Sequence, residues 1–328
     1  MASRAWNEFL GGWSRKSREP KGERNIYGSR LFEGVNSLNA VHENPMIGTN
    51  GTAQWGLNAI CMLELVGDKL PESLSTMRKA PATPEEREFL KADAANWETV
   101  FEDDFKADWK RNWFAGGEKA DIKNVPTGLL YKAGETAASD ADHAVLWTRQ
   151  SFEGDIRVEF DFQKKDDATK FVNILYLFAE GSGVGEYSTD ISQWTNLRKI
   201  PAMKTYFEHM KAYHISFSAF ENDNSNPAED YIRARCYLPE RGKGLTGTEL
   251  KPDYLRTGLF QKNTIYHLCI IRRGNDLLMQ VKGDGKEFYT RWNTADFPPL
   301  KSGRIGLRLM GSRVSEFRNF TVYKINEK

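Results

Sequence analysis

Two arginines in the middle of the chain have a spacing that suits the binding of an acidic ligand. Arg233 and Arg235 lie two residues apart in the alternating segment 231–238, so both side chains fall on one face of a predicted strand, together with Tyr231 and Tyr237. The opposite face is apolar and points to the core: Ile232, Ala234, Cys236 and Leu238. Guanidinium groups bind a carboxylate or sulfate with paired donors, and aromatic rings suit the apolar face of a sugar.

A histidine on the preceding predicted strand, 215–220, adds a group that can transfer protons. Ile215 and Phe217 belong to the core, so His214, Ser216 and Ser218 face outward. If the two strands pair, His214 lies beside the two arginines and two tyrosines of the outer face. His214 is therefore a candidate general base or acid, with Tyr231 as a candidate partner.

The orientation of two neighbouring side chains is not settled by this alternation alone. His209 lies just before the strand, so its direction stays open, and it is a second candidate for proton transfer. Tyr213 falls on the core side and is expected to be buried, unless a bulge at residues 212–213 reverses the parity.

A structural interpretation of the two arginines stays open beside the functional one. On a solvated sheet face, Arg233 and Arg235 would pair with carboxylates, for which Glu159, Asp161 and Glu208 are the candidates. Two aromatic residues near a glycine-rich loop, Tyr187 and Trp194, are expected to form a rim over the cleft. The loop itself does not match a nucleotide-binding motif, because no third spaced glycine follows.

Several catalytic motifs are absent. The segment Glu159-Phe-Asp-Phe-Gln-Lys164 resembles the two-carboxylate pattern of sandwich-fold glucanases, but Lys164 stands where the second glutamate would be. No GxSxG or HExxH motif occurs. We expect no required cofactor and assign no metal ligand, although carboxylates such as Asp103 and Asp104 leave room for a structural calcium ion.

The elements that would position these residues are short strands. The segment 155–162 alternates cleanly, 171–178 is apolar on both faces, and 266–272 with 277–282 forms a predicted hairpin. Further strands are predicted at 304–309 and 317–325. This pattern predicts an all-β antiparallel sandwich of the jelly-roll type over residues 97–328.

Residues 1–96 have a different character and are predicted to form a partly helical N-terminal extension that packs on the sandwich. One helix is expected at Trp55 to Val66. A second begins near Thr83, which is followed by Pro84 and acidic residues, the usual start of a helix. A disordered linker is the alternative, although the apolar run from Ile60 to Val66 disfavours it.

Composition limits the classes of partner. The 328 residues carry 46 Lys and Arg against 45 Asp and Glu, so nothing indicates nucleic acid or membrane as a partner. Cys61, Cys236 and Cys269 are expected to be free buried thiols. Residues 6–34 are too polar for a signal peptide. The opening Met-Ala-Ser would suit a start that replaces a removed signal, so a periplasmic or secreted location is preferred to the cytoplasm, and the compartment and oligomeric state stay open.

The order of the strands resembles the concanavalin A-like lectin/glucanase superfamily. The similarity rests on Val100-Phe-Glu-Asp-Asp-Phe, on Gly303-Arg-Ile-Gly-Leu-Arg-Leu and on Phe317-Arg-Asn-Phe-Thr-Val-Tyr. The segments that start at Phe207 and Asp230 are similar to the YesU-like family, a domain of unknown function. This resemblance covers about 230 residues. It implies a role in the breakdown of acidic plant or algal polysaccharides such as pectin or ulvan.

Three functions are compatible with these residues. The first is β-elimination at a uronic acid, in which Arg233 and Arg235 neutralise the carboxylate, while His214 or His209 and a tyrosine transfer protons. A sugar as leaving group would make the protein a polysaccharide lyase, and water would make it an oligosaccharide dehydratase. The second is carbohydrate binding without catalysis, and the third is a glycoside hydrolase with an atypical carboxylate pair.

Overall fold

The computed structural model describes residues 82–220 and 230–326. The chain divides into two compact units, Met1–Pro81 and Ala82–Lys328, and every described residue belongs to the second. The predicted helix at Trp55 to Val66, its packing and the state of Cys61 lie outside the described residues. In the part that is described, no helix has the length and apolar character needed to cross a membrane.

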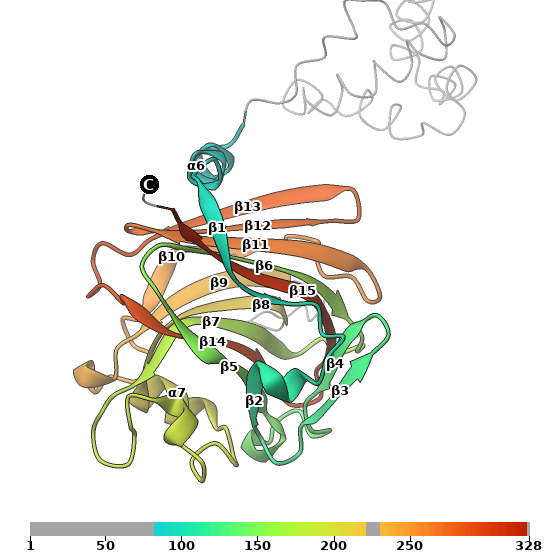
Figure 1. Ribbon diagram of the computed structural model, residues 1–328, viewed down its shortest axis with the longest axis vertical. Coiled ribbons are helices and arrows are strands. Elements are labelled where there is room, and N and C mark those ends of the chain that lie inside the picture. The colour runs from blue at the N-terminus through green and yellow to red at the C-terminus, as the bar shows by residue number, and fades with distance from the viewer. Residues whose placement is uncertain (1–81, 221–229, 327–328) are drawn as a thin grey trace, which may run out of the picture. The chain divides into compact units, whose positions relative to one another are not determined.

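The second unit is a sandwich of two antiparallel sheets (Figure 1). The first sheet has the order β13-β12-β11-β6-β15-β4-β3, with β1 paired to β15, and the second has the order β10-β9-β8-β7-β14-β5-β2. We call them the eight-stranded and the seven-stranded sheet. The strands are β1 Trp97–Asp103, β2 Trp113–Gly116, β3 Asp121–Val125, β4 Gly128–Lys132, β5 Ala144–Glu153, β6 Ile156–Lys164, β7 Phe171–Gly181, β8 Met210–Phe220, β9 Asp230–Tyr237, β10 Glu249–Leu255, β11 Ile265–Arg273, β12 Asp276–Gly283, β13 Lys286–Asn293, β14 Ser302–Leu309 and β15 Val314–Ile325. The helices are α6 Pro84–Asp93 and α7 Met203–His209, with 3-10 turns η2 Trp109–Arg111, η3 Asp140–Asp142, η4 Ile191–Gln193 and η5 Pro239–Arg241.

The core between the sheets follows from the alternation in the sequence. On β6, Ile156, Val158, Phe160 and Phe162 are fully buried, as predicted. Their rings and methyl groups pack against apolar side chains of the seven-stranded sheet, for example Phe162 against Phe217 with ring centroids 5.1 Å apart. The all-β jelly roll predicted from the sequence is therefore confirmed.

The predicted pairing of the two central strands is also confirmed. β8 and β9 are antiparallel neighbours, and Ile232, Ala234 and Cys236 are buried in the core between the sheets. Tyr213 is buried on the core side as expected. The outward position predicted for Ser218 is wrong, because a bulge shifts the register between Ser216 and Ala219.

Ser218 itself has a φ of 44° and is fully buried. Its hydroxyl accepts a hydrogen bond from Arg313 Nη2 at 2.9 Å. The bulge therefore turns this side chain away from the outer face, while Tyr231, opposite Ala219, stays on that face.

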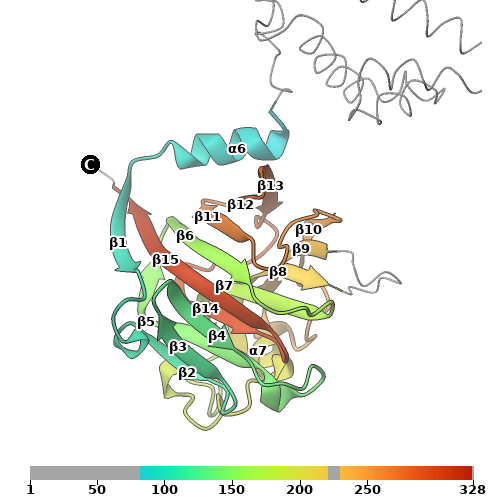
Figure 2. The same ribbon diagram turned by 90° about the vertical axis from the view of Figure 1, so that its right-hand side faces the viewer.

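The helix predicted to begin at Thr83 is present as α6, which lies against β12 and β13 (Figure 2). Thr83 is the N-cap and accepts a hydrogen bond from the Glu86 amide at 3.1 Å. Phe89 and Ala92 are buried in a small cluster with Cys269, Ile271 and Leu278. α6 thus covers the outer side of the eight-stranded sheet.

The outer face of the seven-stranded sheet is covered by the long connection between β7 and β8. This connection, residues 182–209, contains η4 and α7 (Figure 1). Ile191, Trp194 and Tyr206 from the connection are buried together with Trp147 and Tyr176 of the sheet. Apolar burial on both faces makes this sheet an interior layer over part of its width.

Candidate functional site

Strand register brings a row of polar and aromatic side chains together on the outer face of the seven-stranded sheet. On β8, His214 lies between Tyr176 of β7 and Arg235 of β9. Two residues along β8, Ser216 lies between Ile174 and Arg233. Since side chains of directly paired residues share one face, these groups form a continuous polar strip across three strands.

His214 is almost completely buried, with 5% of its surface exposed. Its Nδ1 lies 2.5 Å from the hydroxyl of Tyr237, and its Nε2 lies 2.6 Å from the hydroxyl of Ser216. Burial lowers the pKa of His214 well below its usual value, and the positive charges of Arg235, Arg308 and Arg233 lower it further. The imidazole is therefore neutral at physiological pH and able to accept a proton.

Both predicted arginines point to the outer face, and each has a carboxylate partner. Arg233 contacts Asp253, with Nη2 2.9 Å from the carboxylate, and its guanidinium lies over the ring of Tyr231. Arg235 contacts Glu249 at 2.7 Å through Nη1. The structural interpretation named Glu159, Asp161 and Glu208 as carboxylate partners. These residues lie on β6 and α7, so that part of the interpretation is wrong.

The correct partners come from β10. This strand pairs with β9 at the edge of the sheet and was not predicted. Through the same Nη1, Arg235 also donates to the hydroxyl of Thr248 and to the carbonyl of Leu245, at 3.1 and 3.3 Å. The guanidinium is thereby held in one orientation along β10.

A cavity of about 210 Å³ opens over this strip. Its polar wall is formed by His214, Ser216, Arg233 and Arg235, and Tyr231 contributes an aromatic surface. The remaining lining residues are apolar: Phe171, Val172, Met203, Phe220 and Met310. The volume is below the range of about 300–1,000 Å³ typical of sites for drug-sized ligands, so the cavity suits a group of about one sugar ring.

Four of the eight residues predicted for the site do not line this cavity. Tyr237 is fully buried behind His214, so it cannot stack on a ligand. Burial raises the pKa of Tyr237 well above its ordinary value, which keeps the phenol protonated. His209 ends α7, and its ring is stacked on that of Tyr187 with centroids 3.5 Å apart, away from the cavity.

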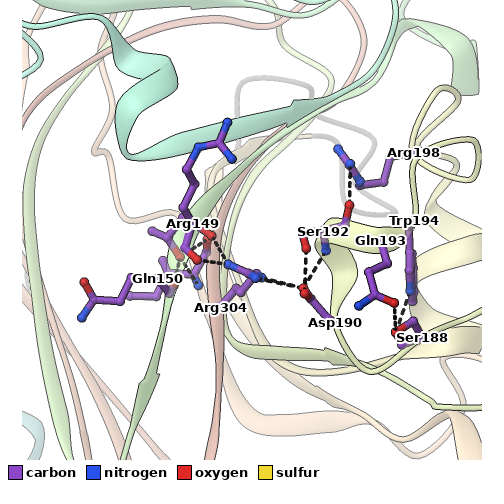
Figure 3. A network of polar contacts seen from close by, with 11 residues as sticks. Arg149, Gln150, Ser188, Asp190, Ser192, Gln193, Trp194, Arg198 and Arg304 are labelled. Carbon is purple, nitrogen blue, oxygen red and sulfur yellow. Dashed lines mark hydrogen bonds and ion pairs between the residues drawn. The ribbon is translucent and has the colours of Figure 1, made fainter.

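Trp194 does not form the exposed rim that the sequence suggested. It is 1% exposed, and its indole nitrogen donates to the carbonyl of Ser188 at 2.7 Å. Figure 3 shows the surrounding network, in which Arg304 reaches from β14 to Asp190 in the covering connection. Asp190 also accepts from the amide of Ser192 and so caps η4. The hydrogen bond of Trp194 thus stays within the connection, while its ring belongs to the buried cluster on the outer face of the sheet.

The acidic residues that resembled a glucanase pattern lie on the opposite sheet. Glu159 and Asp161 are on β6, where His267 is 2.9 Å from Asp161 and 3.7 Å from Glu159. Although burial raises the pKa of Glu159, the His267 hydrogen bond and the charge of Arg157 outweigh it and lower the pKa to about 2. A carboxylate held ionised in this way is unsuited to the role of general acid.

Within the described residues, no group of three or more His, Cys, Asp or Glu could hold a metal ion. Asp103, near which a calcium ion seemed conceivable from the sequence, accepts hydrogen bonds from the Phe105 amide, Asn112 and Trp113. Its oxygens are occupied by protein donors. The two cysteines that the structure describes, Cys236 and Cys269, are free and buried, as predicted.

Sequence reasoning missed a buried aromatic cluster beside the site. Trp147 and Tyr176 stack at 5.6 Å, and Tyr206 of α7 packs on both. Gly306 makes this stacking possible, because a Cβ there would come within 2.4 Å of the Trp147 ring. The alternation of β14 contained the signal: core positions at Ile305 and Leu307 imply that Gly306 and Arg308 face outward.

Comparison with solved structures settles the fold class. A protein of unknown function with a galectin-like fold from Bacillus subtilis aligns with a TM-score of 0.52 and 17% identity, over 69% of this chain and 97% of that one. The fold is lectin-like. Peanut lectin aligns with a TM-score of 0.46 and 11% identity over 70% of this chain and 100% of its own. The carbohydrate-binding module CBM66 from Bacillus subtilis aligns with a TM-score of 0.39 and 12% identity, over 65% of this chain and 96% of its own.

Residues 1–71 match the family described as PcRGLX-like protein C-terminal alpha/alpha toroid domain. The match lies inside the segment that sequence analysis assigned to an N-terminal extension, whose boundary at residue 96 stays a prediction. No functionally curated protein matches the chain. The finer resemblance to the YesU-like family also stays a prediction.

Proposed function

We propose that the cavity over His214 binds a uronic acid residue of an oligosaccharide and supports β-elimination there, as part of acidic polysaccharide breakdown. The observation that carries this proposal is His214 itself. It is a neutral imidazole at the floor of a cavity, held by two hydroxyl groups and flanked by two guanidinium groups. The match of residues 1–71 to a family related to rhamnogalacturonan lyases points to the same class of substrate.

The chemistry requires a base, because the C5 hydrogen of a uronic acid is only weakly acidic. In the tautomer with a proton on Nδ1, His214 donates to the Tyr237 hydroxyl, and Nε2 keeps its lone pair toward Ser216 and the cavity. Nε2 then takes the C5 proton, the electrons form the C4–C5 double bond, and the C4–O bond breaks. Burial lowers the pKa of His214, so Nε2 is unprotonated at the start of the reaction, although the same burial makes it a weaker base.

The arginines supply the electrostatic part of the reaction. As C5 loses its proton, negative charge builds on the neighbouring carboxylate, and a nearby guanidinium stabilises it. Arg235 suits this role because its described contacts all use Nη1, which leaves Nε and Nη2 for a ligand. Arg233 adds positive charge on the same wall of the cavity.

The leaving oxygen at C4 needs a proton, and Tyr231 is the residue we assign to supply it. It lines the cavity on the same face as Arg233, whose guanidinium lies over its ring. Whether a sugar or water leaves decides between a lyase and a dehydratase. The residues required are the same in both reactions.

Binding without turnover is a second candidate, and the ion pairs favour it. Asp253 and Glu249 already neutralise part of the charge of Arg233 and Arg235, so these arginines stabilise new negative charge less strongly. A binding protein of this kind would hold acidic saccharides through Nε and Nη2 of Arg235, the charge of Arg233 and the ring of Tyr231.

The two candidates are separated by mixing the full-length protein with uronate oligosaccharides and recording ultraviolet absorbance. Elimination creates a double bond conjugated with the carboxylate, so absorbance rises with time if the proposal holds. Heat of binding without a rise in absorbance would favour the binding candidate. Neither signal with pectin, ulvan or their fragments would refute both.

A further inference from the structure

Arg308 is a fully buried arginine with no carboxylate partner among the described residues. It lies on β14, and its exposed fraction is 0%. Only Nη2 makes hydrogen bonds, to His143 Nδ1 at 2.8 Å and to the carbonyl of Pro201 at 2.6 Å. Nε and Nη1 are buried without a hydrogen-bond partner. A charge in this state destabilises the free protein, since desolvation costs several kcal/mol.

A second buried arginine shows that the fold can satisfy such a group. Arg313 is also 0% exposed, but its Nε contacts Asp166 at 3.1 Å. Its other nitrogens donate to the carbonyls of Phe171 and Ser218 and to the Ser218 hydroxyl. Arg313 is therefore a structural arginine, whereas Arg308 retains unused donors.

The surroundings of Arg308 contain neutral polar groups, and no carboxylate among the described residues is in contact with it. The Trp147 indole nitrogen and the Tyr206 hydroxyl are buried without partners, and the guanidinium of Arg308 lies 5.2 Å from the centre of the Tyr206 ring. His143 accepts from Arg308, so its Nδ1 carries no proton. Tyrosine hydroxyls can accept as well as donate, but they carry no negative charge, so a buried cation with no carboxylate in contact suits a ligand that is an anion.

Arg308 lies on the same face as the cavity over His214 and just beyond its wall. Its cross-strand neighbour on β7 is Ile174, which is followed on β8 by Ser216 and on β9 by Arg233. Three strand spacings separate the backbones of Arg308 and Arg233, or roughly 14 Å. Met203 and Met310 line the cavity on the side of Arg308. Both side chains are unbranched and adapt easily to a ligand.

We propose that Arg308, with Tyr206 and Trp147, forms a second anion-binding subsite that receives another carboxylate of the same saccharide. This inference rests on the proposed function. It specifies the substrate as an oligosaccharide with at least two acidic groups, one at Arg233 and Arg235 and one at Arg308. The methionines move aside to join the subsite to the cavity.

The test compares Arg308→Met with Arg313→Met in the full-length chain. Methionine fills similar space without charge, so it removes the uncompensated cation at position 308, whereas at position 313 it breaks the buried ion pair with Asp166 and leaves the carbonyls of Phe171 and Ser218 without their donor. We expect the melting temperature of Arg308→Met to be within about 2 °C of the wild type or higher, and that of Arg313→Met to fall by roughly 10 °C. A similar fall in both would make Arg308 structural and overturn the inference.

Ligand binding supplies the second readout. Arg308→Met should weaken binding of trigalacturonate about tenfold or more and leave the affinity for galacturonate unchanged, because the monomer fills only one subsite. Equal affinities of wild type and variant for the trimer would refute the subsite while leaving the proposed function intact.

If neither saccharide binds the wild type, the proposed function fails. Thermal protection by inorganic sulfate then tests whether Arg308 binds an anion. Sulfate stabilises proteins in general, so the comparison is between the two proteins at equal concentration. Greater thermal protection of the wild type than of Arg308→Met would support the anion site. Equal protection would overturn it.

Discussion

At the scale of single residues, the character of His214 follows from its burial and its two hydroxyl partners. A histidine in water is half-protonated near pH 6.5, but desolvation and three nearby arginines keep this one neutral. Tyr237 fixes the ring from behind, and the cavity lies in front. On an exposed strand the same side chain would be largely protonated at mildly acidic pH and could not accept a proton.

Replacing His214 with alanine should cut turnover of a uronate oligosaccharide by roughly 10²–10⁴, the range expected for loss of a general base. Ligand affinity should stay within about tenfold, because Arg233 and Arg235 bind a charge that is already present before the reaction. Steady-state kinetics combined with calorimetry measure both quantities. Full turnover by the variant would exclude His214 as the proton acceptor.

Removing only the hydroxyl of Tyr237, by Tyr237→Phe, should lower turnover by about tenfold, the usual value of one hydrogen bond. The ring stays in place, so binding should not change. Tyr213→Phe is the matched control, since the Tyr213 hydroxyl is buried without a partner on the core side of the same sheet. If both variants have equal activity, the contact between Tyr237 and His214 plays no part in the reaction.

The face of the sheet on which some of these residues lie could be predicted from the sequence, because side chains alternate between the two faces of a strand. Period-two alternation placed His214, Arg233 and Arg235 on one face, and the register of β8 and β9 agrees. The alternation predicts the face on which a side chain lies, but it does not predict how far that side chain is buried. Tyr237 was therefore expected at a ligand surface, as was Trp194 from its place after the glycine-rich loop, although both are buried.

At the scale of elements, the connection between β7 and β8 determines how much of the sheet a ligand can reach. Arg304 of β14 fixes this connection through Asp190, and the same carboxylate caps η4 (Figure 3). Arg198 adds a hydrogen bond from its Nη1 to the carbonyl of Ala115 at 2.7 Å. The cover is thus tied to both β14 and β2.

Asp190→Ala should loosen this connection selectively. Loss of the cap costs about 1 kcal/mol, and loss of the partly exposed ion pair adds at most a similar amount. Hydrogen exchange followed by mass spectrometry should show faster exchange around residues 191–194 and unchanged exchange in β8 and β9. Uniformly faster exchange across the sandwich would mean that Asp190 stabilises the whole unit instead.

α6 should contribute to the stability of the sandwich through one side chain. Phe89→Ala is expected to cost about 3 kcal/mol, because Phe89 is 1% exposed and packs on Tyr289 at 5.4 Å. Leu90→Ala is the control on the same helix: Leu90 is 47% exposed, so the change should be within about 0.5 kcal/mol. Urea unfolding measures both values, and equal effects would show that α6 does not pack as described.

Two elements escaped prediction for different physical reasons. β10 contains a proline and charged residues, so it lacks the apolar alternation of a strand, yet it supplies the carboxylates that hold both arginines. The bulge at Ser218 is set by Arg313, a residue almost a hundred positions away in the chain. Contacts of this kind depend on tertiary packing, which local sequence does not encode.

At the scale of the whole molecule, three histidines should shape the pH dependence of stability. Hydrogen bonds to Asp161 and Glu159 raise the pKa of His267 to about 9, while burial lowers that of His143 to about 4 and that of His214 well below 6.5. Between pH 6.5 and 9 the folded state holds more protons than the unfolded chain at His267, so this stabilisation is lost as pH rises. His143 and His214 act in the opposite sense. As the pH drops below 6.5, the unfolded chain binds protons at these two histidines before the folded state does, so the free energy of unfolding falls.

Thermal unfolding across pH 4 to 10 should therefore give a maximum near neutral pH. His267→Gln is expected to flatten the alkaline side, and on the acidic side to change stability only where Glu159 and Asp161 titrate, below about pH 5. The ring of His267 is partly exposed, so the effect should also shrink with added salt. An alkaline side that is the same in the variant would contradict the assigned role of His267.

The most direct test of the central claim is the structure of the His214→Ala variant in complex with a uronate oligosaccharide. The substitution removes the base and preserves the ligand. We predict a uronate carboxylate within hydrogen-bond distance of Arg235, over the outer face of the seven-stranded sheet, with C5 directed toward position 214. A saccharide bound on the eight-stranded sheet, or bound with its carboxylate away from both Arg233 and Arg235, would contradict the account.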